Sequence, residues 1–355
     1  MYRLELNQAP IYPIEKDKNS TGMYKGLFDC FDVNFIKRPF GNFPVPGFFF
    51  RFRARSTITL TCADENFISK TYLFGTHLFC FMESIFWEKS TGRKLSYRRL
   101  TPFFSFRSPV SLIDSSVLIR FPSRIVKIFY KLREHKIDTF LEFKGDAVRP
   151  DVKASFYMDT QRKEAAAVSF GRRWSLKKMF QASMKIFSPV SGSVIVNGEA
   201  PVIHLFTPEK AVAFMDMRKG YYFLKTRIHV LTGLGFYEGK SLSFYFAGEW
   251  NFSEPQTVES GIFYDGKSYQ LPPVKITRPF GITRNWIIQD TESLVDLVFV
   301  PAKDGDIHRN LSLFILRTDY HTVFGEFEGL LKTTKGDKFN LKAFPGTGTK
   351  KLLRM

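Results

Sequence analysis

Short runs of β-branched and aromatic residues recur along almost the whole chain, separated by turns of Gly, Asp, Asn or Ser. Examples are the runs FFFRFRAR, STITLTCA, NFISKTYLF and LFCFMESIFWEK in the first hundred residues. Short strands at this spacing, with few 3.6-residue patterns, are typical of an all-β sandwich or barrel. We therefore predict an all-β fold, and the length of 355 residues predicts two separate cores.

Turn signals are plainest between Ser191 and Gly266. The dipeptide Asn197-Gly198 accepts positive φ at both central positions of a two-residue hairpin, and Glu238-Gly239 and Asp265-Gly266 lie likewise between apolar runs. The run SLSFYF alternates apolar and mostly polar residues, as a strand with one buried face does. The number of such runs after residue 185 predicts a complete antiparallel barrel, which either fills with side chains or holds one small ligand.

The segment SRIVKIFYKLREHK is ambiguous. The spacing of Ile125, Ile128, Phe129 and Leu132 suits a helix, whereas its β-branched and aromatic content suits strands. We predict strands here.

A shift in composition near residue 185 places the boundary between the two halves. We predict an N-terminal extension over residues 1–23, a basic β-barrel domain over 24–185, a second β-barrel domain over 186–345 and a basic tail over 346–355. The tail GTGTKKLLRM lacks the GxxxxGK[ST] spacing of a phosphate loop, so we expect a frayed end.

The net charge of +18 is unevenly spread, because residues 1–185 carry 32 Lys and Arg against 17 Asp and Glu, and later residues carry 20 against 17. Such a field concentrates anionic partners near the protein. Within residues 161–185, basic and aromatic residues alternate, which predicts binding to an anionic membrane surface or, second, to nucleic acid. A solvated linker is the alternative. The basic residues are Arg162, Lys163, Arg172, Arg173, Lys177, Lys178 and Lys185.

Three cysteines without CxxC spacing predict reduced thiols and no disulfide framework. The start of the chain lacks the apolar segment of a secretory signal, and no apolar run approaches the roughly 20 residues of a membrane-spanning helix. We expect a cytoplasmic protein. The six histidines form no HExxH pair or Cys/His cluster, and GxSxG and GxGxxG motifs are absent, so we expect no metal site and no cofactor.

Several motifs occur in a particular order between residues 188 and 346: SGSVIVNG, FMDMRKG, TVESGIFYDGK, DYHTVFGEFEG and KGDKFNLKAFPG. In order and spacing they resemble the family named domain of unknown function 2804, of which this chain looks like a divergent member. That family is similar to lipocalin-like two-barrel proteins that include carotenoid hydratases. The resemblance implies two tandem lipocalin-like antiparallel β-barrels and an apolar, lipid- or isoprenoid-like ligand. The chain departs from the family pattern at Met217, Arg218 and Lys219, where that pattern has Trp, Gly and Arg.

Asp216 is the candidate catalytic acid, because it follows the apolar run AVAFM and burial of a carboxyl group disfavours its charged form. A neutral acid beside aromatic rings could protonate an alkene, and the ring faces would stabilise the cation formed. The structural alternative is an ion pair between Asp216 and Lys219 or Arg218. The remaining candidate ligand-binding residues are Lys219, Tyr221, Phe223, Phe244, Phe246, Trp250, Glu259 and His321.

Three functions follow from these features. The first is binding of a hydrophobic small molecule in the C-terminal barrel. The second is an interaction module that docks its basic N-terminal half on an anionic membrane or nucleic-acid surface. The third, implied by the resemblance, is a hydratase or cyclase acting on an isoprenoid-like substrate with Asp216 as acid.

Overall fold

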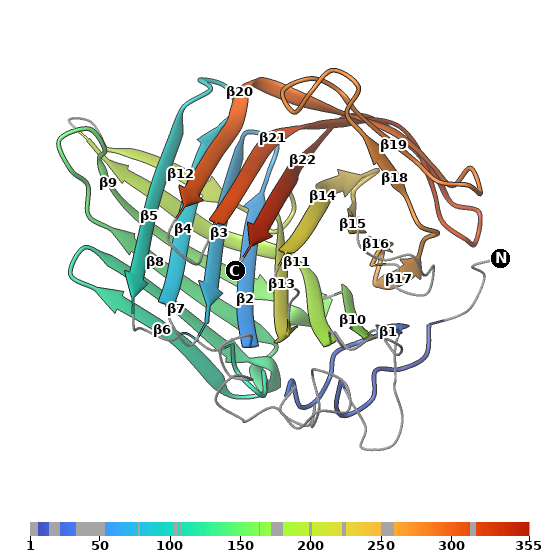
Figure 1. Cartoon of the computed structure of the whole chain (residues 1–355), viewed down its shortest axis with the longest axis horizontal. Coiled ribbons are helices and arrows are strands. Elements are labelled where there is room, and N and C mark those ends of the chain that lie inside the picture. Colours follow the sequence, from blue (N-terminus) through green and yellow to red (C-terminus); the bar gives the residue numbers. More distant parts are fainter. Residues whose placement is uncertain are drawn as a thin grey trace.

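A computed structural model shows an all-β chain, as predicted. It describes residues 6–13, 22–32, 54–76, 79–102, 106, 108–162, 164–171, 180–198, 201–221, 225–249, 259–312 and 317–354. Within these ranges the only helices are two short 3-10 helices, η1 (Leu132–Glu134) and η2 (Thr160–Arg162). The strands belong to two antiparallel sheets, each of which curls on itself (Figure 1).

The first sheet contains thirteen of the described strands, β1 to β13, all from the first 221 residues. Its main path has the order β5-β4-β3-β2-β13-β11-β9-β8-β7-β6, with β1 beside β10 and both β10 and β12 beside β11. The strands are β1 (Gly22–Lys25), β2 (Ala54–Ala63), β3 (Phe67–Gly75), β4 (Phe79–Glu88), β5 (Lys94–Pro102), β6 (Ser115–Phe121), β7 (Arg124–Lys131), β8 (Lys136–Phe143), β9 (Asp151–Asp159), β10 (Glu164–Gly171), β11 (Phe180–Asn197), β12 (Val202–Phe206) and β13 (Val212–Tyr221).

The second sheet contains nine described strands in the order β17-β16-β15-β14-β22-β21-β20-β19-β18. Its long central strands, β20 to β22, cross in front of β3 to β5 in Figure 1. The strands are β14 (Lys225–Tyr237), β15 (Lys240–Glu249), β16 (Gly261–Tyr264), β17 (Lys267–Gln270), β18 (Lys275–Thr277), β19 (Trp286–Gln289), β20 (Val295–Ser312), β21 (Arg317–Lys332) and β22 (Lys338–Arg354).

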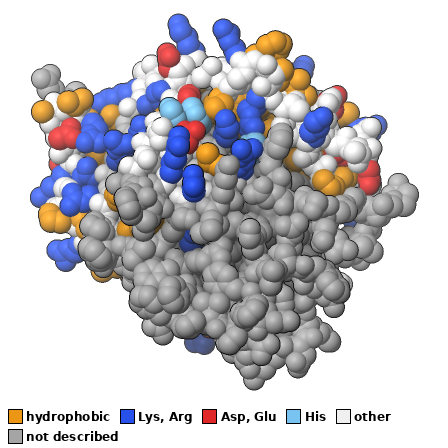
Figure 2. Space-filling model, viewed as in Figure 1, with side chains coloured by type: hydrophobic (Ala, Val, Ile, Leu, Met, Phe, Trp, Pro, Cys, Tyr) orange, Lys and Arg blue, Asp and Glu red, His pale blue; other side chains and the backbone are white. Residues whose placement is uncertain are grey.

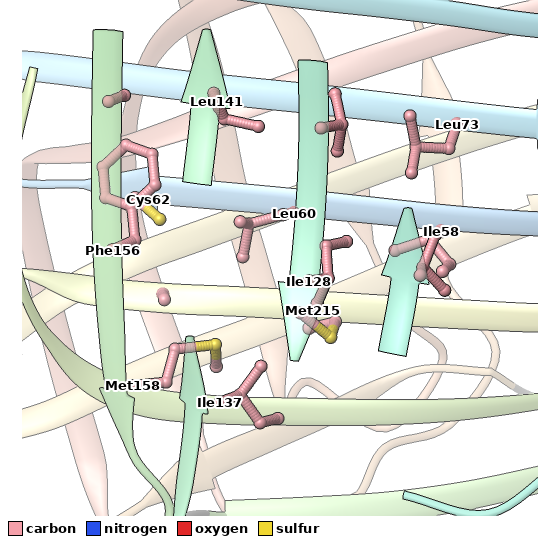
Figure 3. Packing of buried hydrophobic residues seen from close by; sticks show 14 of the residues in the cluster. Ile58, Leu60, Cys62, Leu73, Ile128, Ile137, Leu141, Phe156, Met158 and Met215 are labelled. Carbon is pink, nitrogen blue, oxygen red and sulfur yellow. The ribbon is translucent and has the colours of Figure 1, made fainter. Parts of the chain in front are cut away.

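The inner face of the first sheet is filled by apolar side chains. Because strand residues alternate between faces, Ile58 and Leu60 of β2 point the same way, and they meet Ile128 of β7 and Phe156 of β9 from the opposite wall. Figure 3 shows these side chains in the space between the two walls. The curl of the sheet is thus closed around a packed core.

The inner face of the second sheet is filled by aromatic rings that lie against glycines. A Cβ at Gly233 would stand 2.1 Å from the Phe244 ring, and one at Gly346 would stand 2.2 Å from the Phe327 ring. These two glycines are cross-strand partners on β14 and β22, so the absence of two neighbouring side chains leaves space for the rings. The glycines are therefore required for the core of this sheet to pack.

Two of the predicted hairpin turns are confirmed by their backbone angles. Glu238 and Gly239 have φ of 50° and 78° between β14 and β15, and Asp265 and Gly266 have φ of 50° and 76° between β16 and β17. The ambiguous segment forms β7 and β8, as predicted, with η1 between them.

The chain passes from the first sheet to the second between β13 and β14, whereas the predicted domain boundary after Lys185 falls within β11. The domain division itself stays a prediction. The expectation of a frayed end over 346–355 was wrong, since β22 continues to Arg354 and pairs with both β14 and β21. The physical reason is that Gly346 and Gly348 alternate with Thr347 and Thr349. The glycine face packs against the aromatic rings of the inner core, and the threonines lie on the opposite face.

The sheets pack through their outer faces, over β2, β3, β4, β11 and β13 on one side and β14, β15, β16, β21 and β22 on the other. Aromatic pairs form the apolar part of this contact. Trp87 stacks on Phe324 with ring centres 5.3 Å apart, and the ring of Phe187 is tilted against that of Phe263 with centres 4.2 Å apart. Beside these pairs, the outer faces carry threonines and charged residues. This polar part encloses the candidate site.

Candidate functional site

An inner pocket of about 110 Å³ lies between the outer faces of the two sheets. Its lining is unusual for a sheet-to-sheet contact because threonines face each other across it. Alternation along β2, β21 and β22 places these hydroxyls on one face of each strand. The threonines are Thr57, Thr59, Thr61, Thr232, Thr322, Thr347 and Thr349.

An outer pocket of about 410 Å³ continues from the inner pocket, with which it shares Tyr72, Phe74, Tyr320, Lys351 and Leu353. Rings from β3 and β4 form its apolar wall. Among the described residues that line it, every charged side chain is a cation. These cations are Arg98, Arg99, Arg309 and Lys351. Figure 2 shows Lys and Arg side chains together on the part of this face that β20 to β22 occupy.

Lys351 lies where the two pockets join. Its Nζ donates a hydrogen bond to the Tyr72 hydroxyl at 2.5 Å and stands 4.4, 5.0 and 5.8 Å from the ring centres of Tyr72, Phe74 and Tyr320. Burial, and next the nearby Arg55, lower the pKa of Lys351 to about 7, against the opposing effect of Glu83. At neutral pH this amine is therefore neutral in about half of the molecules.

A second lysine, Lys70, faces the inner pocket from β3 and donates to the Thr349 hydroxyl at 2.9 Å. Burial lowers the pKa of Lys70 to about 8. The buried Glu83, which also lines the inner pocket, accepts hydrogen bonds from Arg309 Nε at 3.0 Å, from the Ser96 hydroxyl and from the Tyr320 hydroxyl. Glu83 thus joins β4 of the first sheet to β20 and β21 of the second.

Four buried charged residues form an ion cluster at the other end of the inner pocket: Lys185, Asp216, Arg218 and Glu259. Lys185 Nζ lies 2.8 Å from Glu259 Oε1 and 3.4 Å from Asp216 Oδ1. Arg218 lies 2.9 Å from a carboxylate oxygen of each acid. Both cations also lie over the ring of Tyr245 on β15. The ion cluster therefore ties β11 and β13 to the second sheet.

Glu259 gives the ion cluster a pH dependence. Burial acts to raise the pKa of Glu259, but Arg218 and Lys185 outweigh it and lower the pKa to about 2. A depressed folded-state pKa contributes stability that is present above the unfolded value of 4.5 and is lost as the pH falls through about 2.

We expect the free energy of unfolding of the wild-type protein to fall as the pH drops from 4.5 to 2, and Glu259→Gln to remove part of this dependence. Urea titrations at a series of pH values measure it. Wild-type and Glu259→Gln curves with the same slope over this interval would contradict the assignment.

The structure brings together two of the sequence candidates, Asp216 and Glu259. The pairing of Asp216 with Arg218, one of the structural alternatives, is present. Pairing with Lys219 is not found: Lys219 points to the opposite face of β13 and donates to the carbonyl oxygens of Phe31 and Pro109 at 2.8 and 2.9 Å. The reason is strand alternation, which places residues 216 and 218 on one face and 219 on the other.

The other candidate ligand-binding residues lie apart from the two pockets or outside what is described. Phe244 and Phe246 are buried in the inner core of the second sheet. His321 Nδ1 donates a hydrogen bond to a carboxylate oxygen of Asp306 at 3.0 Å. The side chain of Tyr221, together with Phe223 and Trp250, lies outside the described residues.

The predicted anionic-surface cluster also lies outside the described residues, apart from the backbone of Arg162 in η2. The residues concerned are Arg162, Lys163, Arg172, Arg173, Lys177 and Lys178. Its surface role stays a prediction.

One group of described residues has the composition of a metal site, although the sequence predicted none. His308, Asp319 and His321 bring ligand atoms within 4.8 Å of one another, because His308 and His321 are cross-strand partners on β20 and β21. The two rings stack, and each contacts a carboxylate, His308 with Asp319 and His321 with Asp306. We propose no metal here. Cys30, Cys62 and Cys80 are free thiols.

Sequence reasoning missed Lys70, Tyr72, Glu83, Tyr320 and Lys351. The available signal was a charged residue inside an otherwise apolar or threonine-rich strand, as at Lys70 in FISKTYLF and Lys351 in the chain end. Alternation alone does not say whether such a residue faces solvent or a second sheet.

A profile of the family described as "Domain of unknown function (DUF2804)" matches residues 54–352. None of the curated proteins matches this chain significantly. Among solved structures, the crystal structure of kievitone hydratase from Nectria haematococca is similar at 10% identity and a TM-score of 0.45, covering 84% of this chain and 87% of that one. The crystal structure of CghA is similar at 9% identity and a TM-score of 0.43, covering 85% and 88%. Likenesses at this level say nothing about what this chain binds.

No helix in the described ranges is long and apolar enough to cross a membrane.

Proposed function

The chain belongs to the family described as domain of unknown function (DUF2804), so its function must come from its own site, and we propose that it binds a small amphipathic molecule between its two sheets. The ligand has an apolar body and an anionic head. The observation that supports this most is the outer pocket, whose described lining combines aromatic rings with cations and holds no acid.

The apolar body of the ligand is supported by the walls of both pockets. Phe74, Phe79 and Phe81 form one side of the outer pocket, and Leu353 closes it from the second sheet. The volume of about 410 Å³ lies in the range of small-molecule sites. This location differs from the predicted one inside the C-terminal barrel, where Phe244 and Phe246 occupy the core.

The anionic head is supported by the charges at the outer pocket. Arg98 on β5 is the cross-strand partner of Glu83, and Arg309 Nε on β20 lies 3.0 Å from Glu83 Oε1. Lys351 adds a further partial charge. The local excess of positive charge favours a carboxylate or similar group, and the net charge of +18 concentrates such ligands near the protein.

Three ligands of equal chain length test the head group: decanoate, decanol and decylamine. We expect the affinity order decanoate, then decanol, then decylamine. Arg98→Gln should weaken decanoate binding about tenfold or more, since a hydrogen bond to a charged group contributes about 1.5–3 kcal/mol, and should leave decanol binding unchanged. Native mass spectrometry and calorimetry measure both. Arg133→Gln, which removes an exposed charge from η1, is the matched control.

Equal affinity for decanoate and decylamine would overturn the anionic head, and failure of all three ligands to bind would overturn the proposed function. The hydratase or cyclase role stays a prediction. In the structure Asp216 makes ion pairs with both Lys185 and Arg218.

A further inference from the structure

Three lysines lie between the sheets, Lys185 fully buried and Lys70 and Lys351 partly buried, and they differ in their partners. Lys185 contacts two carboxylates and is fixed in the ion cluster. Lys70 donates to a threonine hydroxyl. Lys351 donates to a tyrosine hydroxyl, and in the described part of the chain it makes no ion pair. Within the described residues neither Lys70 nor Lys351 makes an ion pair, and of the two it is Lys351 that lines both pockets.

The position of Lys351 is that of a reactive group at the junction of two spaces. Lys351 belongs to the linings of both the inner and the outer pocket, so a ligand extending from one to the other passes this residue. The rings of Tyr72, Phe74 and Tyr320 surround the amine and keep its environment apolar. The Tyr72 hydroxyl, 2.5 Å away, is placed to exchange a proton with it.

We propose that Lys351 forms a Schiff base with an aldehyde or ketone group of the bound ligand. This inference rests on the proposed function, because it uses the same pockets, and it adds that the ligand class carries a reactive carbonyl.

The reaction balances without an added oxidant or reductant. The neutral amine attacks the carbonyl carbon, so a C–N bond forms while the C–O π bond breaks. A proton moves from nitrogen to oxygen, giving a carbinolamine, and the Tyr72 hydroxyl relays it. The C–O bond then breaks, water leaves, and a C=N bond forms. One water molecule is released for each imine, and hydrolysis reverses the step.

The surroundings of Lys351 favour this reaction at neutral pH, because they lower the pKa of its amine. Burial is the main cause of its lowered pKa of about 7, compared with 10.5 for an ordinary lysine. The neutral fraction at pH 7 is thus about a thousandfold larger than for an exposed lysine. The titratable and charged groups that bear on it come from several strands. They are Arg55 of β2, Tyr72 of β3, Glu83 of β4, Arg218 of β13 and Tyr320 of β21.

Reductive trapping tests the proposal. The full-length protein is treated at pH 7 with substoichiometric decanal and cyanoborohydride, and the decyl-lysine formed is located by peptide fragmentation. We expect Lys351 to be labelled at least about tenfold more than its neighbour Lys350, which lies on the opposite face of β22. Excess decanoate should suppress the label, and labelling should rise as the pH increases through about 7.

Two variants accompany the experiment. Lys351→Met should lose the selective label and Lys350→Met should keep it, whereas Tyr72→Phe should slow formation of the label on Lys351. If decanal and decanoate bind but no selective label forms on Lys351, the Schiff base is overturned and the binding function stands. If neither molecule binds, both are overturned.

Discussion

Replacing Lys185 with methionine is expected to destabilise the folded protein by about 3–5 kcal/mol, the range for removal of one partner from a buried ion pair. Lys185 is almost fully buried and lies against both Glu259 and Asp216. Without it, two carboxylates share the single cation Arg218, and one of them is left with uncompensated charge. The desolvation of that charge, more than the lost attraction, produces the loss of stability.

Urea denaturation measures this prediction, with Lys240→Met as the control. Lys240 pairs with Asp265 at 2.8 Å, but both side chains are about half exposed, so its replacement should cost less than about 1 kcal/mol. A loss for Lys185→Met no larger than that for Lys240→Met would show that the ion cluster does not hold the two sheets together.

The second large effect concerns the inner pocket, which a tryptophan at Thr59 is expected to fill. Thr59 lies in the middle of β2, between β3 and β13, yet its side chain is only partly buried because it faces the pocket. An indole there occupies the space beside Tyr72, its cross-strand partner on β3, and pushes toward Lys351. We expect decanoate affinity to fall about a hundredfold or more, equivalent to roughly 3 kcal/mol.

The control for this substitution is Thr283→Trp, at an exposed position outside both pockets. Overpacking alone costs about 1–3 kcal/mol of stability, so circular dichroism and a urea titration establish that Thr59→Trp remains folded at the assay temperature. A folded Thr59→Trp protein that binds decanoate as tightly as the wild type would place the ligand elsewhere.

A polar pocket between two sheets is a costly arrangement. Buried polar groups contribute most to stability when they are fully paired. Here the ion cluster and Glu83 make ion pairs, whereas among the described residues Lys70 and Lys351 donate hydrogen bonds to hydroxyls alone. Perturbed lysines beside a pocket are typical of functional sites. The ion cluster is therefore the structural end of the inner pocket, and Lys351 marks its reactive end.

Local features of the fold were accessible from sequence. The dipeptides Glu238-Gly239 and Asp265-Gly266 predict hairpins because their residues tolerate positive φ, and both turns are present. Alternation in SLSFYF separated the inner Phe244 and Phe246 from Tyr245, which faces the other sheet.

The site depended on information that a single sequence does not carry. Lys70 and its partner Thr349 are 279 residues apart, and so are Tyr72 and Lys351. Local patterns predict that each strand has two faces, but not which face meets a second sheet. The same limit applied to Asp216, whose burial was anticipated while its cross-strand partner Lys185 was assigned to a surface cluster.

The most direct measurement of the central claim is photo-crosslinking with a diazirine-bearing decanoic acid, followed by peptide mapping of the labelled residues. Binding between the sheets predicts label on the pocket-facing residues of β3, β4, β21 and β22, suppressed by excess decanoate. Label on the inner core of the second sheet, at Phe244 and Phe246, or label that decanoate does not suppress, would contradict it.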